Sequence, residues 1–206
     1  MGNVVIVIIG HCGVSGKSVI FVIMEESCFK YVVPVFDLIH TCGQGCFVGN
    51  TFITSGHVIG TETKYLFWNR ERIPLDPKEA LSIQIISEDK DENSQNDFAL
   101  FNFNGINSPL KLSDSLPPVG VILDCLTWAP NNDMSEVNGF LKRVICKGEV
   151  VSHYYHFFSC RMELNLQEGA SGSPLIMDNT VWGILSGHDE SKCEDELFFQ
   201  STAFLR

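Results

Sequence analysis

GCFVGNTFITSGHV, residues 45–58, is the stretch that points most directly to the fold class, because it holds two strand-like runs, a turn and a terminal histidine. The runs are rich in aromatic and β-branched residues, which favour extended strands. Gly-Asn-Thr, residues 49–51, separates them with residue types that are common in tight turns. The pattern therefore predicts a β-hairpin, with His57 at the end of its second strand.

Similar short runs recur along the chain and are separated by clusters rich in Gly, Asn, Asp and Pro. They cover residues 31–39, 64–68, 81–87, 97–103, 119–128, 139–164, 173–177, 180–187 and 197–205. Many short strands with regular turn signals predict an all-β protein, either a sandwich or closed barrels. The last few residues are expected to form a short terminal helix.

Composition excludes several functional classes. The 206 residues are 45% hydrophobic and 19% charged, which suits one large or two small compact domains. A net charge of −11 argues against a nucleic-acid partner. Residues 4–9 are too few to span a bilayer, and no signal peptide is recognisable, so we expect a cytoplasmic protein without membrane attachment.

The cysteines are interpreted in line with the expected cytoplasmic location. In the absence of an export signal, the eight cysteines are expected to be reduced thiols. Cys42 and Cys46 are four residues apart and have no matching second pair, so the sequence predicts no zinc site. We expect no metal and no cofactor. The acidic segment at residues 87–96 is expected to be a solvated loop.

The N-terminal stretch VVIVIIGHCGVSGKSVI, residues 4–20, ends in Gly-Lys-Ser and so raises the question of a phosphate-binding loop. The glycine required five residues before Gly16 is replaced by His11, and the residues after Ser18 form an apolar β-branched run in place of a helix. We therefore predict two strands, at about 4–9 and 18–24, joined by a turn. Nucleotide binding through Lys17 is the less favoured alternative.

Three segments together suggest chemistry. A strand-like run ends in His57, Asp97 opens an apolar run, and Ser171 lies between glycines just before another run. A serine hydroxyl becomes a nucleophile when a histidine takes its proton, and an acid is needed to hold that histidine in the correct tautomer. Gly169 and Gly172 allow a turn in which the N–H groups of Gly169 and Ser171 converge on an oxyanion.

In these segments the chain resembles the trypsin/chymotrypsin-like serine endopeptidases of the PA clan. GQGCFVGNTFITSGHV, NDFALF and EGASGSPLI are similar to the family's histidine, aspartate and serine motifs, and VWGILSG resembles its specificity-pocket strand. The resemblance implies two six-stranded antiparallel β-barrels, over residues 29–112 and 113–206, preceded by a hairpin extension over residues 1–28. It also implies that His57 is the general base, Asp97 the orienting acid and Ser171 the nucleophile.

Two departures from the family pattern indicate which branch of the family the chain resembles. Val58 replaces the cysteine that secreted trypsins place after the histidine, and Ala170 replaces the aspartate that pairs with a newly cut N-terminus. The chain therefore looks more like intracellular, bacterial HtrA-type or viral polyprotein-processing enzymes. The added hairpin is expected to cover a barrel edge or to dock a regulatory protein partner.

The resemblance also places the substrate pocket. One wall corresponds to Asn165 and Leu166, and the other to Leu185, Ser186 and Gly187. No carboxylate in these segments pairs with Lys or Arg, so a protein or peptide substrate is expected to present an apolar side chain there. The alternative to a serine endopeptidase is a catalytically idle protease fold that serves as a binding module.

Overall fold

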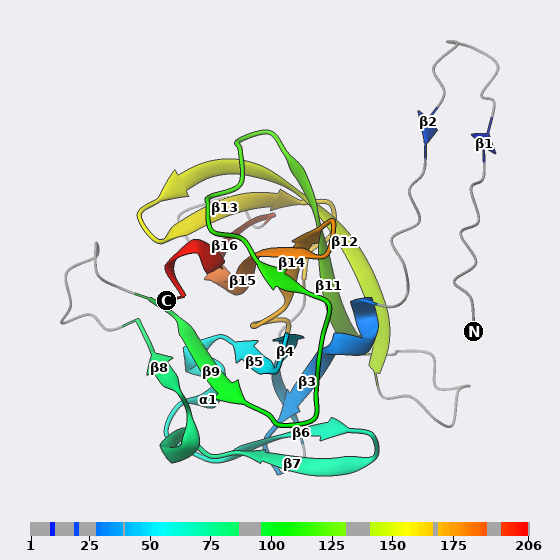
Figure 1. The fold of residues 1–206 in the computed structure, drawn as a ribbon. Helices are drawn as coiled ribbons and strands as arrows, with labels where there is room; N and C mark the ends of the chain where they lie inside the picture. Colours follow the sequence, from blue (N-terminus) through cyan, green and yellow to red (C-terminus); the bar gives the residue numbers. More distant parts are fainter. Residues whose placement is uncertain are drawn as a thin grey trace.

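The described residues form mainly β-strands, most of which lie in two seven-stranded, largely antiparallel sheets (Figure 1). The computed structural model describes residues 9–10, 19–20, 28–38, 40–86, 96–130, 141–166, 169–188 and 195–205. The predicted all-β class is confirmed.

The first sheet is built from residues that the sequence assigned to the first barrel. Its seven strands run in the order β7-β6-β3-β4-β5-β9-β8 and curl into an open half-barrel. They are β3 (Val32–Phe36), β4 (Thr41–Val48), β5 (Thr51–Thr54), β6 (Lys64–Trp68), β7 (Glu71–Leu75), β8 (Ser82–Gln84) and β9 (Phe98–Asn102). The hairpin predicted from residues 45–58 is β4–β5, in which Val48 pairs with Thr51.

The second sheet closes on itself. Six strands form a ring because β15 pairs with β16 as well as with β14, and β10 adds a parallel edge strand. The strands are β10 (Lys111–Leu112), β11 (Ile122–Pro130), β12 (Leu141–Tyr154), β13 (Phe157–Met162), β14 (Pro174–Met177), β15 (Thr180–His188) and β16 (Glu196–Ser201). Asp178 and Asn179 join β14 to β15 with φ of 51° and 59°, the left-handed conformation that two-residue hairpin turns require.

Short elements complete the described fold. A two-stranded sheet pairs β1 (Ile9–Gly10) with β2 (Val19–Ile20), as predicted for the N-terminal hairpin. The rest of the predicted strands at 4–9 and 18–24 lies outside the described residues. The helical turns are η1 (Cys28–Tyr31), α1 (Gly56–Ile59), η2 (Pro77–Glu79) and η4 (Thr202–Phe204). The last of these confirms the short terminal helix.

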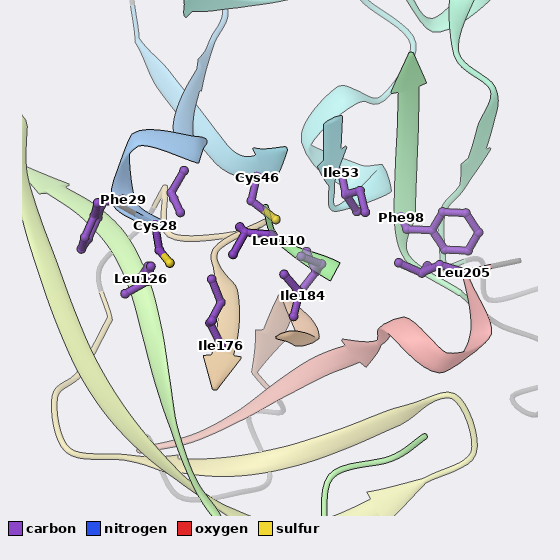
Figure 2. Packing of buried hydrophobic residues seen from close by; sticks show 12 residues of the cluster. Cys28, Phe29, Cys46, Ile53, Phe98, Leu110, Leu126, Ile176, Ile184 and Leu205 are labelled. Carbon is purple, nitrogen blue, oxygen red and sulfur yellow. The ribbon is translucent and has the colours of Figure 1, made fainter. Parts of the chain in front are cut away.

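An apolar core joins the two sheets. Figure 2 shows side chains of both sheets converging on one another, with η1 packed between them. The labelled residues come from η1 (Cys28, Phe29), from the first sheet (Cys46, Ile53, Phe98), from the second sheet (Leu126, Ile176, Ile184) and from the connecting and terminal segments (Leu110, Leu205). All are buried, and burial of this apolar surface holds the sheets together.

A buried glutamine fixes how the two sheets are placed at the site. The Gln44 side chain donates from Nε2 to Thr127 Oγ1 (2.9 Å) and to the Trp128 carbonyl (2.7 Å), and its Oε1 accepts from the Trp128 N–H (2.7 Å). Gln44 is fully buried, so losing one of these bonds would leave an unpaired polar group in the interior. Because Gln44 lies on β4 and its partners lie on β11, the bonds cross between the sheets.

The described cysteines form no disulfide with one another. They are Cys28, Cys42, Cys46, Cys125, Cys146 and Cys160. Burial raises the pKa of Cys46 and of Cys160 to about 12, so at neutral pH these groups are thiols, which are poor nucleophiles. Cys12 and Cys193 lie outside the described residues.

We therefore expect a reducing agent to leave the melting temperature of the purified protein unchanged, because the described cysteines form no disulfide with one another. The measurement is a thermal melt with and without reductant, next to a thiol titration of the unfolded chain. A loss of roughly 2–5 kcal/mol of stability on reduction, the usual effect of removing a disulfide, would contradict the prediction.

Candidate active site

His57 lies on a short helix directly after β5. The sequence placed it at a strand end, but β5 stops at Thr54 and α1 begins at Gly56. The change of direction requires glycine, since a Cβ at residue 56 would lie 1.9 Å from the Gln84 carbonyl oxygen. The turn carries the His57 side chain towards the start of β9.

Asp97 meets His57 there through two hydrogen bonds. The His57 backbone N–H donates to Oδ1 (3.0 Å), and the ring Nδ1 lies 2.7 Å from Oδ2. The Ser186 hydroxyl also donates to Oδ2, at 2.5 Å. Asp97 is only 1% exposed, so its carboxylate is held by protein donors in place of water. This arrangement fixes the ring and puts the proton on Nδ1.

The Asp97 contact alters the proton affinity of His57. The hydrogen bond to Asp97 raises the pKa of His57 above 6.5, and the negative charge of Asp97 adds to this, while partial burial opposes it. The His57 side chain remains 40% exposed. Within the described residues its Nε2 makes no hydrogen bond, which leaves that nitrogen able to take a proton from a nucleophile.

Ser171 sits on a turn that only glycines allow. Gly169 and Gly172 have φ of +86° and +87°, and a Cβ at residue 172 would lie 1.8 Å from the Gln44 carbonyl oxygen. The Ser171 carbonyl accepts from the Gln44 N–H (2.7 Å), and the Gly172 N–H donates to the Leu185 carbonyl (2.8 Å). The turn is thus held by β4 on one side and by β15 on the other.

Gly43 shows that the serine turn and the histidine helix are neighbours. A Cβ added at Gly43 would meet Val58 Cγ2 at 2.5 Å and the Ser171 carbonyl oxygen at 3.0 Å. Val58 follows His57 directly, so residues 57–58 and 171 flank the same point of β4. No hydrogen bond joins the Ser171 hydroxyl to His57 in the described part of the chain. Such bonds are often long in unliganded enzymes.

The backbone N–H groups predicted to bind an oxyanion are available. Among the described residues, neither the Gly169 nor the Ser171 N–H donates a hydrogen bond to another protein group. The neighbouring carbonyls are occupied: that of Gly169 accepts from Gln44 Nε2 (3.2 Å), and that of Ala170 accepts from the Ser173 N–H (3.0 Å). The segment is therefore anchored while its two N–H groups stay free.

The residues predicted to line the substrate pocket do not share one environment: some pack against the core and others face the site or open space. Leu185 is only 4% exposed and packs in the core of the second barrel, where Leu166 packs against the same cluster. Ser186 faces Asp97, as described above. A Cβ at Gly187 would have no neighbour within 4 Å, so this strand segment faces open space.

Two surface cavities flank the serine turn and the histidine helix. One, of about 230 Å³, is lined by residues of β11 and β12 together with Leu164, Asn165, Leu166 and Ala170. It contains the first predicted wall but no residue of the second. The other, of about 260 Å³, is lined by Cys42, His57, Val58, Ile59, Gly60, Thr61, Glu62 and Lys64. No pattern in the sequence had indicated this second cavity.

The described residues include no cluster of three or more His, Cys, Asp or Glu side chains suited to a metal ion. Nor do they include a helix with the length and apolar character needed to cross a membrane.

Comparison with known proteins identifies the fold. No protein-family model and no curated protein sequence matches the chain. Solved structures do match: an inactivated protease paralogue of the scabies mite has a TM-score of 0.62 at 14% identity, over 86% of this chain and 89% of that one. Mouse neuropsin, a serine protease, has a TM-score of 0.61 at 15% identity, over 84% and 90% of the two chains.

A viral enzyme is equally similar. The catalytically active tobacco etch virus protease, in complex with product, has a TM-score of 0.59 at 14% identity, over 85% of this chain and 74% of that one. At such identities the likeness establishes a trypsin-like two-barrel fold. Because mite, mouse and viral proteins match at similar levels, they do not single out a branch.

Proposed function

We propose that the chain is a serine endopeptidase in which His57, Asp97 and Ser171 form the triad. The observation that carries this proposal is the 2.7 Å contact between His57 Nδ1 and the buried Asp97, which leaves Nε2 free beside the serine turn. The buried Asp97 carboxylate accepts hydrogen bonds from the His57 backbone N–H, the His57 ring and the Ser186 hydroxyl. Such a dedicated charge partner is typical of a functional histidine.

In the proposed reaction, His57 Nε2 removes the proton of the Ser171 hydroxyl as Oγ attacks the substrate carbonyl carbon. Asp97 keeps the Nδ1–H tautomer and stabilises the imidazolium that forms. The N–H groups of Gly169 and Ser171 donate to the oxyanion of the tetrahedral intermediate. His57 then protonates the leaving amine, and a water molecule, activated by the same nitrogen, hydrolyses the acyl-enzyme.

The alternative is a binding module without activity. One observation favours it: Ser171 makes no hydrogen bond to His57 among the described residues. In addition, the scabies mite protein that shares the fold is an inactivated protease paralogue. The intact triad residues and the free N–H groups favour the enzyme. A fluorophosphonate probe separates the two, because it reacts only with an activated serine.

The expected result is labelling of the wild-type protein that disappears in Ser171→Ala. A labelled peptide recovered after digestion should contain Ser171. Absence of labelling at every pH between about 6 and 9 would support the binding module. In a separate measurement, ATP binding that depends on Lys17 would support the nucleotide-binding alternative.

We propose that the physiological ligand is a protein or peptide, handled in a reducing compartment such as the cytoplasm. The described cysteines support this setting, because they form no disulfide with one another and oxidising compartments favour disulfides. The N-terminal hairpin, which forms its own two-stranded sheet, is proposed as the contact site for a regulatory partner.

Substrate preference gives a prediction of its own. Asn165 and Leu166 supply no negative charge, so Lys or Arg before the scissile bond would be desolvated without a partner. We expect cleavage after medium or large apolar residues, with rates graded by about 10–200-fold among them, as is usual for pockets of this kind. The measurement is a peptide-library cleavage profile beside Ser171→Ala, and a profile dominated by Arg, Lys or Gln would contradict it.

A further inference from the structure

Gln200 reaches from the second barrel to the backbone of the proposed catalytic acid. It lies on β16, is 0% exposed, and its Oε1 accepts from the Asp97 N–H at 3.0 Å. The two residues are 103 positions apart in the sequence. Asp97 is itself buried, so this bond is shielded from water on both sides.

The orientation of the Gln200 amide is fixed by its other contacts. Its Nε2 donates to the carbonyl oxygens of His156 (3.0 Å) and Ser201 (3.2 Å), and carbonyls can only accept. The oxygen of the amide must therefore face Asp97, where an N–H donor stands. Each polar atom of Gln200 has a partner, as a buried amide requires.

A second tie holds the same segment. His156 Nδ1 lies 2.8 Å from Asn96 Oδ1, and its ring stacks on Phe204 with centroids 4.5 Å apart. The His156 carbonyl also accepts from the Ser201 N–H (2.8 Å). Residues 96–97, which directly precede β9 of the first sheet, are thus attached to the β12–β13 turn and to β16 of the second barrel.

The position of the Asp97 backbone decides where its carboxylate lies relative to His57. Strand β9 begins at residue 98, so the pairing of this strand does not itself hold the Asp97 backbone. We propose that Gln200 is a positioning residue, which holds the Asp97 backbone so that its carboxylate stays in contact with His57 Nδ1. This inference rests on the proposed function, since it assigns Gln200 a role through the triad.

The experiment replaces Gln200 with Met, which keeps the volume and removes both the acceptor and the donors. Misplacement of a catalytic group by about 1 Å can cost about 10²-fold in rate. We expect Gln200→Met to lower kcat by about 10–100-fold with KM changed by no more than about twofold. The matched control is Thr202→Val, which removes a buried hydroxyl that donates to the Val181 carbonyl (2.7 Å) and, among the described residues, makes no hydrogen bond to Asp97.

A second readout does not depend on turnover. Titration of the His57 imidazole by NMR should show its pKa lowered towards 6.5 in Gln200→Met and unchanged in Thr202→Val, because only the first variant loosens Asp97. If Met is not tolerated, Gln200→Asn keeps the amide but falls one methylene short, and the same two measurements apply.

Each outcome decides the inference. It is overturned if Gln200→Met keeps wild-type kcat and His57 pKa, or if Thr202→Val shows equal losses, which would indicate general destabilisation. If the wild-type protein has no turnover, the proposed function fails, and the His57 titration alone then supports or overturns the positioning role.

Discussion

Replacing Ser171 with Ala is expected to remove nearly all peptide-bond hydrolysis, by about 10⁶-fold in kcat, since the attacking oxygen is lost and water must take its place. The fold should survive, because the Ser171 hydroxyl makes no hydrogen bond within the described residues and its backbone contact with Gln44 is retained. The measurement is kcat on the best substrate of the cleavage profile, with circular dichroism to confirm folding.

His57→Ala should show a similarly low residual rate, and the double variant should be little worse than either single one. The triad acts as a unit, so removing the base makes the nucleophile useless. Ser115→Ala, an exposed serine, is the control for the substitution itself. Activity near the wild-type level in either alanine variant would refute the triad.

The sequence predicted the parts of this site that depend on residue type and order. His57, Asp97 and Ser171 each stood in a short motif, and the positive φ of Gly169 and Gly172 shows why glycines flank the serine. Turns were also predictable, since Asp178 and Asn179 adopt the left-handed conformation that suits these residues.

Contacts that depend on the packing of two sheets could not be predicted. Gln44 stood in a glycine-rich segment expected to be a turn, and Gln200 stood in a predicted strand. The structure places Gln44 within β4, and both residues are fully buried and bind across the sheets. Gln200 and the next residue, Ser201, are both 0% exposed within the β16 strand. No local pattern marks a polar residue whose partner lies 84 or 103 positions away.

The predicted pocket illustrates the same limit. Leu185 was expected to face substrate because its segment resembles a pocket strand, but strand alternation turns its side chain into the core. Ser186, its neighbour, consequently points the other way and reaches Asp97. A shift of one residue decides which face a strand residue occupies, and resemblance at low identity does not fix it.

Asp97→Asn is expected to fold normally and to lose about 10⁴-fold in kcat. An amide can still occupy the space between His57 and Ser186, but its NH₂ would donate to His57 Nδ1. The imidazole would then carry its proton on Nε2, the nitrogen that has to act as base. Asp124→Asn is the matched control, because Asp124 pairs with Lys147 away from the site (3.1 Å).

The pH dependence gives this variant a second, independent signature. In the wild type, the rate should fall as pH drops through the raised pKa of His57, above 6.5, because the base becomes protonated. Since the folded-state pKa is the higher one, protonated His57 also adds stability, which is fully present below 6.5 and is lost as pH rises through the folded pKa. In Asp97→Asn both effects should diminish, with the acid limb of the pH–rate profile moving to lower pH. A profile with the same acid limb in the wild type and in Asp97→Asn would show that Asp97 does not control the base, even if the rate had fallen.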